Sequence, residues 1–572
     1  MKNSINNYNR IFDILNKNEK LKVISLIILF IFVALIETLS LALLLPLIYI
    51  LLNQDSEIFY TIKNILSFFN SSISNSEIII LSIFFVSLLY IVKAIIYSIS
   101  VRLNLIITAN ITLNLTNDLY KSYLKEKYIF HLNENTSRLA RNILTEVHNY
   151  SAIIALFTQL IGELVMITFM AIMLILIEPV IVISIIAILS IIAGTYYFIF
   201  TKLVEKWGLI RQKMDFLRIK FINEGFSLIK EIKIYKLENI FAYRQNDAYK
   251  KSQYSDVNVA FLSSLAKPIL ETISVVAFMG FLLYLVIYNS ENLSLSHHIP
   301  FIALLAAATF KILPAVQAVY QRLQHIKYIS PSIDAVYDNL KSLKISEHKI
   351  EVEKQIKFRK KIEILNVNFS YPKKQNTINN FSFTINKNDI IGIVGRSGSG
   401  KTTLLNILMG IFSPSSGKVL CDGLDINLSI NSWFDNIAYV SQNIVLFDDT
   451  IKNNIIFGKK YDESKFNDVI KKSQLNNFIK NLPMNENTEV GERGFRISGG
   501  ERQRIAIARA LYQDSKIIFL DEATNSLDQK TEQEFIDTII ELNNEITFVI
   551  VAHNSKMIDI CNKKISLELK ND

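Results

Sequence analysis

The sequence predicts an α-helical membrane domain followed by an α/β domain, and three observations support this fold class. Apolar segments long enough to cross a bilayer fill the chain up to about residue 320. From there on, short apolar runs alternate with polar segments, as in a water-soluble α/β domain. Within this second part, a glycine-rich motif of the phosphate-binding type joins an apolar run to a helical pattern.

The composition of the 572 residues excludes several classes of protein. Half of the residues are hydrophobic and only 20% are charged, so a disordered or purely soluble chain would expose too much apolar surface. The chain has 17 glycines and 9 prolines, too few for a collagen-like or low-complexity protein. Its two cysteines, Cys421 and Cys561, make no disulfide framework.

The first domain is predicted to contain six membrane spans. A bilayer core of ~30 Å needs about 20 helical residues. Segments of this kind cover residues 21–51, 78–100, 152–177, 180–203, 268–287 and 299–320. The first of them is too long to be a signal peptide and lacks a small-residue cleavage site.

The basic residues of the connections predict the orientation of these spans. Lys and Arg are concentrated in residues 102–145 and 202–267, whereas residues 53–76, 178–179 and 289–298 contain almost none. Because basic connections stay in the cytoplasm, we expect both termini and the second domain to be cytoplasmic. This placement accounts for much of the net charge of +9, so we expect a membrane partner and no nucleic acid.

Two kinds of connection carry helical patterns. The basic connections have apolar residues at helix-like spacing, for example over residues 221–235, which favours spanning helices that continue beyond the bilayer; unattached amphipathic loops are the alternative. Residues 56–70 form a short amphipathic pattern that is too short to span. This segment either lies in the outer interface or caps the helix bundle.

Five ionisable residues fall inside the predicted spans or at their edges, namely Glu37, Lys93, Glu163, Glu271 and Lys311. A charge at the bilayer centre costs ~2.5 to 3.5 kcal/mol on insertion scales. We therefore expect each of them to face an interior cavity or to pair with another side chain. A structural interhelical pair and a contact with substrate are both open.

The strongest chemical signal follows a buried-strand pattern at residues 389–394. The motif G-x-x-x-x-G-K-[ST] begins at Gly395 and is followed by helical spacing. In this motif, backbone amides and the helix N-terminus approach phosphate oxygens, Lys401 reaches the β- and γ-phosphates, and Thr402 supplies a ligand for Mg²⁺. The predicted nucleotide-binding residues here are Gly395, Ser397, Gly398, Ser399, Gly400, Lys401, Thr402 and Thr403.

A second motif supplies carboxylates, which a phosphate cradle alone lacks. Residues 517–520 are an apolar run typical of a strand buried on both faces, and Asp521 and Glu522 follow at its carboxyl end. This position suits Asp521 to hold Mg²⁺ and Glu522 to orient or activate water beside the γ-phosphate.

At this point the chain resembles an ABC transporter. Between the two motifs stands "ISGGE", similar to the family signature L-S-G-G-Q, and "RQRIAIARAL" follows it. The other family motifs occur in the family's order: Tyr371 in "FSYP", Gln442 in "VSQN", residues 525–528, and His553 in "VAHN".

The resemblance implies how these residues act. ATP and Mg²⁺ would be the cofactors, with Tyr371 stacked on adenine, Gln442 and Asp521 joining Thr402 as metal ligands, and His553 contacting the γ-phosphate beside Glu522. Each ATP would lie between the P-loop of one copy and Ser498, Gly499 and Gly500 of another. The family fold would be a domain-swapped homodimer with six spans per chain and a helical subdomain in each α/β P-loop ATPase domain.

Three positions depart from the family pattern. Ile497 replaces Leu and Glu501 replaces Gln in the signature, and Asn554 follows His553 where Arg is common. The added charge of Glu501 near a triphosphate is expected to weaken closure. Arg493, Arg496 or Arg502 would offset that charge.

The order of the domains resembles ABC exporters. We expect a membrane domain over residues 1–325, a linker over 326–350 and a nucleotide-binding domain over 351–572. The segment "TEVGERG" at residues 488–494 looks like the exporter-specific stretch that precedes the signature. The absence of a cysteine-protease domain before the first span argues against exporters that cleave peptide leaders.

A narrower resemblance concerns the cargo. "ALIETLSLALLLPL", "IKEIKIYKLE", "AKPILE" and "FKILPAVQ" are similar to bacterial lipid-linked oligosaccharide flippases of the N-glycosylation type (PglK-like). Lys93, Lys267 and Lys311 match arginines of the basic cavity that such flippases use for pyrophosphate, although Lys lacks the bidentate fork of Arg. The resemblance implies ATP-driven transfer of a polyprenyl-pyrophosphate-linked oligosaccharide to the outer leaflet of a bacterial inner membrane.

Two other classes of function stay open. An ABC exporter of lipids, hydrophobic drugs or peptides would use the same motor with an apolar cavity. A non-transporting ATP-gated channel or regulator would use the motor without moving cargo.

Overall fold

The structure, a computed structural model, describes residues 10–52, 75–177, 179–288, 299–346, 354–371, 374–491, 497–522, 529–552 and 554–567. The chain divides into two compact units. The first consists of Met1–Glu126 and Phe130–Glu347, and the second of Lys127–Ile129 and His348–Asp572.

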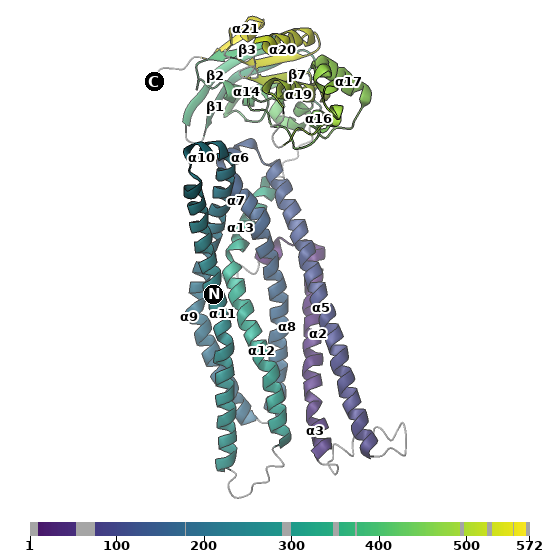
Figure 1. Ribbon diagram of the computed structural model, residues 1–572, viewed down its shortest axis with the longest axis vertical. Coiled ribbons are helices and arrows are strands. Elements are labelled where there is room, and N and C mark those ends of the chain that lie inside the picture. The colour runs from purple at the N-terminus through teal and green to yellow at the C-terminus, as the bar shows by residue number, and fades with distance from the viewer. Residues whose placement is uncertain are drawn as a thin grey trace. The chain divides into compact units, whose positions relative to one another are not determined.

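Long helices build the first unit, and Figure 1 shows them running side by side. They are α2 (Lys17–Ala42), which the short helix α3 (Leu44–Leu52) follows, α5 (Asn75–Lys125), α8 (Val147–Ile177), α9 (Pro179–Ser227), α11 (Glu238–Tyr288) and α12 (Ile299–Ile329). Shorter helices connect or follow them: α6 (Tyr128–Asn133), α7 (Thr136–Arg141), the π-helix η1 (Asn142–Glu146), α10 (Ile229–Tyr235) and α13 (Pro331–Ser346). The predicted linker over residues 326–350 thus contains the end of α12 and all of α13.

Three of these helices are far longer than a bilayer requires. Helices α5 and α11 have 51 residues each and α9 has 49. At 1.5 Å per residue each measures about 75 Å, more than twice a bilayer core of ~30 Å. The basic residues after the predicted spans lie on these same helices, which confirms that the spanning helices continue through much of the basic connections.

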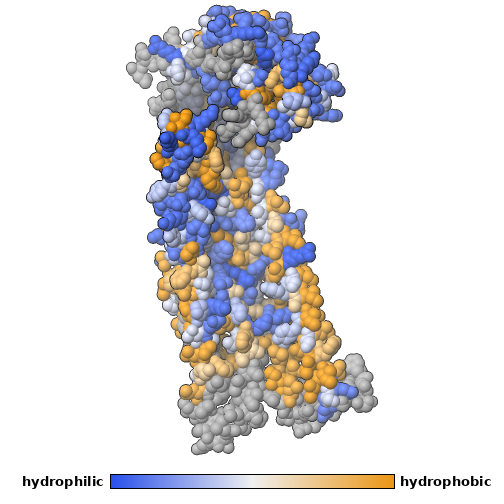
Figure 2. Space-filling view, in the orientation of Figure 1, coloured by the Kyte–Doolittle hydropathy of each residue, from blue (hydrophilic) through white to orange (hydrophobic). Residues whose placement is uncertain are grey.

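Apolar surface covers part of the helical unit. Among the described residues, four helical stretches are long and apolar enough to span a membrane, and they begin at Lys17, Asn75, Thr136 and Glu238. Figure 2 shows hydrophobic side chains gathered where α2 and α3 end and α5 begins. These features indicate a membrane-embedded protein. The predicted spans at residues 180–203 and 299–320 are helical within α9 and α12, and the total of six stays a prediction. The predicted amphipathic segment at residues 56–70 lies outside the described residues.

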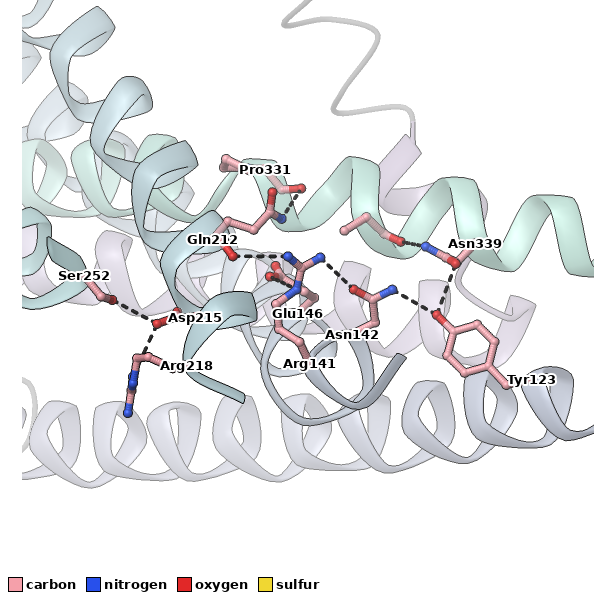
Figure 3. A network of polar contacts seen from close by, with 11 residues as sticks. Tyr123, Arg141, Asn142, Glu146, Gln212, Asp215, Arg218, Ser252, Pro331 and Asn339 are labelled. Carbon is pink, nitrogen blue, oxygen red and sulfur yellow. Dashed lines mark hydrogen bonds and ion pairs between the residues drawn. The ribbon is translucent and has the colours of Figure 1, made fainter. Parts of the chain in front are cut away.

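A polar network joins the helices at the π-helix η1 (Figure 3). Asn142 Nδ2 donates to the hydroxyl of Tyr123 on α5 at 3.0 Å, and this hydroxyl donates to Asn339 Oδ1 on α13 at 3.1 Å. Arg141 Nε lies 3.2 Å from Oε1 of Glu146, whose side chain is fully buried. Because buried polar groups are costly without partners, these contacts fix the relative positions of α5, η1 and α13.

Two sheets form the framework of the second unit. The first is antiparallel with the order β2-β1-β4-β5, and the second is parallel with the order β6-β7-β8-β3-β9. The strands are β1 (Lys361–Tyr371), β2 (Lys374–Asn386), β3 (Ile390–Gly395), β4 (Ser416–Cys421), β5 (Leu424–Asp425), β6 (Ile437–Val440), β7 (Ile517–Asp521), β8 (Thr547–Val551) and β9 (Lys563–Leu567). All residues of β7 and β8 are buried, as their continuous apolar runs predict.

Helices surround the parallel sheet or form a subdomain of their own. They are α14 (Lys401–Leu408), α15 (Ile430–Phe434), α16 (Ile451–Ile456), α17 (Glu463–Lys472), α18 (Asn476–Lys480), α19 (Gly499–Tyr512), α20 (Gln529–Leu542) and α21 (Ser555–Asp559). Helices α16 to α19 share a separate apolar core that includes Ile451, Phe466 and Tyr512. This core corresponds to the predicted helical subdomain.

Candidate functional site

The phosphate-binding motif lies between β3 and α14, as its spacing predicts. Gly400 is the N-cap of α14 and has a φ of 93°, a left-handed conformation that favours glycine. At Gly395 a Cβ atom would lie 2.6 Å from both the carbonyl oxygen of Leu567 and Oγ of Ser399. The loop therefore needs glycine at both ends, and Ser397 and Gly398 lie between them.

Polar groups of this loop suit an anionic ligand. Lys401 Nζ donates to the carbonyl oxygens of Gly395 and Arg396, at 2.9 and 3.0 Å, so the ammonium group is held over the loop. Ser399 Oγ is buried and has no hydrogen-bond partner among the described residues. Thr402 is exposed in the first turn of α14. A buried hydroxyl, an ammonium group and a helix N-terminus in one loop fit the phosphate groups of a nucleotide.

Tyr371 lies next to the phosphate-binding helix. Its hydroxyl oxygen is 3.1 Å from Thr403 Oγ1 on α14. Its ring packs edge to face against Phe369 and Phe412, with ring centroids 5.2 and 5.8 Å apart. Thr403 is therefore a partner of the predicted adenine-stacking residue, a contact that the motif does not reveal.

The predicted carboxylates lie at the same edge of the parallel sheet as the loop. Strands β3, β6 and β7 all end there because they run parallel in one sheet. Gln442 Nε2 donates to Oε2 of Glu522 at 2.7 Å, which joins residues 80 positions apart in the sequence. Glu522 has a φ of 49°, an uncommon conformation for this residue type, and its backbone N–H donates to the carbonyl of Val551 at 2.9 Å.

Asp521 is buried beside Glu522. Burial, and then the neighbouring Glu522 carboxylate, raises the pKa of Asp521, whereas the Tyr439 hydroxyl and the Lys401 ammonium group act in the opposite direction. Burial, together with Asp521, raises the pKa of Tyr439 to about 12. The carboxylate of Asp521, the amide oxygen of Gln442 and the hydroxyl of Thr402 are hard oxygen donors, the kind of ligand that Mg²⁺ prefers. Tyr439 is a neighbour of Asp521 that the sequence motifs do not single out.

The signature motif begins the helix α19 of the helical subdomain. Ser498 is its N-cap, and Gly499 and Gly500 form its first turn. Ile497 is buried in the core of this subdomain, so the aliphatic packing of the family's Leu is retained. The phosphate-binding helix α14 belongs to a different apolar core.

Several predicted residues lie outside the described part of the chain. These are His553, residues 525–528, and Arg493 and Arg496. Asn554 is described: it is the N-cap of α21, accepts a hydrogen bond from the backbone N–H of Lys556 at 3.1 Å and donates to Glu532. Its side chain has a capping function where the family commonly has Arg.

In the helical unit, the structure brings Lys93 and Lys311 together on Glu37. Lys93 Nζ on α5 and Lys311 Nζ on α12 lie 2.7 and 2.9 Å from the same oxygen, Oε1 of Glu37 on α2. The side chains of Glu37 and Lys93 are nearly buried, whereas 41% of the Lys311 side chain is exposed. We call these three residues the Glu37 cluster; it carries two positive charges and one negative charge.

The other ionisable residues of the spans form separate pairs. Glu163 pairs with Arg322 at 3.4 Å, between α8 and α12. Lys267 pairs at 3.8 Å with Glu271 one turn away on α11, and more than half of the Lys267 side chain is exposed. Lys267 therefore pairs with a carboxylate on its own helix and does not share the Glu37 contact of Lys93 and Lys311. The sequence pattern does not single out Arg322, because this residue follows the end of the last predicted span at residue 320.

An apolar cavity of about 220 Å³ lies between α8, α9, α11 and α12. Aliphatic side chains such as Leu174, Ile186, Leu270 and Val316 line it, and Ser190, Ser274 and Thr309 add hydroxyls. None of the three predicted cavity lysines is among its lining residues.

The chain is similar to known transport proteins. Residues 378–525 match a family described as "ABC transporter". A putative export ATP-binding/permease protein of Rickettsia bellii (strain RML369-C) is 41% identical over 201 residues, 35% of each chain. ATP-dependent lipid A-core flippases of Bordetella avium (strain 197N) and Saccharophagus degradans (strain 2-40) are 39% and 29% identical over 37% and 59% of this chain. These three matches span 35% to 56% of the relatives' own lengths.

The fold as a whole is that of a solved transporter. The structure of a bacterial Atm1-family ABC exporter with ATP bound superimposes with a TM-score of 0.76 at 19% sequence identity, and the match covers 97% of this chain and 94% of the exporter chain. The likeness confirms the predicted fold class, a helical membrane domain joined to an α/β nucleotide domain.

Proposed function

We propose, from the premise that the chain contains an ABC transporter domain and has the fold of an ABC exporter, that it is an ATP-driven exporter or flippase. One observation carries the proposal: the phosphate-binding loop, Asp521, and the hydrogen-bonded pair of Gln442 and Glu522 converge on one edge of the parallel sheet. This is the set of groups that ATP hydrolysis needs, because positioning and charge stabilisation account for most of phosphoryl-transfer catalysis.

Each residue has a defined part in the proposed reaction. The loop amides and Lys401 bind the phosphates, and Tyr371 binds the adenine. Thr402, Gln442 and Asp521 hold Mg²⁺, which neutralises charge on the phosphate oxygens when bound. Glu522 orients and activates the attacking water while Gln442 holds its carboxylate. His553 contacts the γ-phosphate.

The proposed working unit is a domain-swapped homodimer in a bacterial inner membrane. Ser498, Gly499 and Gly500 of one copy would close the nucleotide site of the other, and the dimer would contain twelve spans. Both termini and the ATPase domain lie in the cytoplasm in this proposal, because the basic residues follow the cytoplasmic ends of the spans. The membrane domain at residues 1–325, the linker at 326–350 and the nucleotide domain at 351–572 remain part of this proposal.

For the cargo, a polyprenyl-pyrophosphate-linked oligosaccharide is the first candidate. Lys93 and Lys311 converge within 2.9 Å of one carboxylate oxygen, and the Glu37 cluster has an excess positive charge that suits a pyrophosphate. Glu37 already neutralises one lysine, and Lys267 pairs with Glu271, so this site is weaker than three free cations would be.

A lipid with acyl chains is the second candidate, and the apolar cavity favours it. Its aliphatic lining is suited to hydrocarbon rather than to sugar. Two of the relatives are named as lipid A-core flippases, which is consistent with such a cargo.

The experiment that tests the function is transport in proteoliposomes containing the full chain. We expect movement of a fluorescent lipid cargo that requires Mg²⁺ and ATP. Stimulation of ATPase activity by a pyrophosphate-linked polyprenyl glycan, lost in Lys93→Ala and Lys311→Ala, would support the first cargo. Stimulation only by acylated lipids would support the second. ATPase activity without any cargo movement would contradict the exporter function and favour a channel or regulator.

A further inference from the structure

Glu501, the acidic residue that departs from the family signature, binds the serine of that signature. Glu501 Oε2 accepts two hydrogen bonds from Ser498, one from the hydroxyl at 2.6 Å and one from the backbone N–H at 2.9 Å. The backbone N–H of Glu501 lies 3.4 Å from Ser498 Oγ. Together these contacts form a capping box at the start of α19.

The hydroxyl contact limits what Ser498 can do. A serine hydroxyl has a single proton to donate, and here the acceptor is a carboxylate oxygen. A hydrogen bond to an ionised acceptor is roughly twice as strong as a neutral one. Since a phosphate oxygen only accepts, Ser498 must break this contact before its hydroxyl can donate to the phosphate of ATP.

Among the described residues, the charge of Glu501 is not neutralised. Within the described residues, no Lys or Arg side chain forms an ion pair with Glu501. Arg504, three residues further along α19, is bound to Glu534 and to the carbonyl of Gln474. A triphosphate that approached Ser498 would therefore meet the negative charge of this carboxylate.

We propose that Glu501 is a positioning residue that holds the Ser498 hydroxyl away from ATP and thereby sets the ATP concentration at which the dimer closes. This inference rests on the proposed function, in which Ser498 of one copy meets the ATP of the other. Glu501 opposes closure twice: its carboxylate accepts the hydrogen bond of the Ser498 hydroxyl, and its negative charge repels the phosphate oxygen that would accept this hydrogen bond instead.

The test is the substitution Glu501→Gln in the full chain, with ATPase activity measured against ATP concentration. Gln keeps the capping box, because its amide oxygen still accepts from the backbone of Ser498, but it removes the charge. We expect KM for ATP to fall about five- to tenfold while kcat changes less than about twofold. A structural defect would raise KM or lower kcat, so an unchanged or higher KM overturns the proposal.

Glu463→Gln is the matched control. Like Glu501, Glu463 lies in the first turn of a helix, here α17, but it is outside the signature. The same loss of charge there should leave KM and kcat unchanged, and an equal decrease in KM would overturn a specific role for Glu501.

A second measurement tests whether Glu501 acts through Ser498. ATP affinity is measured by binding in the Glu522→Gln background, with and without Ser498→Ala. We expect Glu501→Gln to increase affinity when Ser498 is present and to change it less than about twofold when Ser498 is Ala. Equal effects in both backgrounds overturn the positioning role. If the ATPase activity of the parent protein is absent or does not depend on Glu522, the proposed function itself is refuted. If that activity does depend on Glu522 but Glu501→Gln leaves KM unchanged, only this inference is refuted.

Discussion

The two units of the chain place their polar groups by different means. In the α/β unit, the groups of the nucleotide site come from short motifs at the ends of neighbouring parallel strands, so the sheet itself brings them together. In the helical unit, Glu37, Lys93 and Lys311 come from three helices and meet only through helix packing. The nucleotide site therefore depends on strand order, and the Glu37 cluster depends on pairwise contact between helices.

The substitution with the strongest predicted consequence removes the shared carboxylate of the Glu37 cluster. Glu37→Gln leaves Lys93 and Lys311 without their shared carboxylate, and removal of one partner of a buried ion pair costs about 3 to 5 kcal/mol. We expect a clear fall in the thermal midpoint of the protein in detergent. Glu271→Gln is the control, because its pair with Lys267 is half-exposed and should cost less than about 1 kcal/mol. Equal midpoints of the two variants would refute a structural role for the Glu37 cluster.

The second substitution removes the cation of the phosphate-binding loop. Lys401→Ala loses an ammonium group held over the loop and should weaken ATP binding by about 10- to 100-fold. Nucleotide binding to the purified protein measures this. Lys387→Ala, at an exposed lysine before β3, should bind ATP as the parent does. Unchanged affinity in Lys401→Ala would show that the loop does not hold phosphate.

The third substitution, at Gln442, has a smaller predicted effect and separates catalysis from ATP binding within the α/β unit. Gln442→Ala removes the donor that holds Glu522 Oε2, so we expect ATPase activity to fall about tenfold with ATP affinity retained. Asn443→Ala, at the exposed neighbouring position, should leave both quantities unchanged. If ATP affinity fell and the turnover number did not, Gln442 would act only as a metal ligand and not as a partner of the catalytic carboxylate.

The smallest effect concerns pH. Burial, and then Glu522, raises the pKa of Asp521. The folded nucleotide-free protein therefore binds the Asp521 proton more tightly than the unfolded chain does. This protonation contributes stability at low pH, and the contribution is lost as pH rises through the raised pKa. Because Asn carries no charge, Asp521→Asn should raise the thermal midpoint at neutral pH by up to a few degrees. The thermal midpoint of this variant should also vary less than that of the parent between about pH 4 and about pH 7. A lower midpoint in Asp521→Asn would contradict this sign.

The same contrast explains what the sequence could predict. The loop from Gly395 to Thr403 and the carboxylates at 521 and 522 are local patterns, and strand ends in a parallel sheet meet at one edge. The partner of Lys311 could not be predicted, because Glu37 is 274 residues away and helical spacing does not say which faces of two helices meet. The hydrogen bond between Tyr371 and Thr403 also depends on the packing of strand β1 against helix α14. The capping role of Asn554 could have been predicted, since Asn is a favoured N-cap.

The most direct test of ATP-driven transport is to measure the ATPase rate of Glu522→Gln together with its ATP binding. Because Glu522 activates the attacking water in the proposed reaction, we expect hydrolysis to fall by about 100-fold or more while ATP affinity stays within about threefold of the parent. Cargo movement in proteoliposomes should stop in parallel. Equal hydrolysis by Glu522→Gln and the parent, or cargo movement that continues in the variant, would contradict the claim that ATP cleavage at this site drives transport.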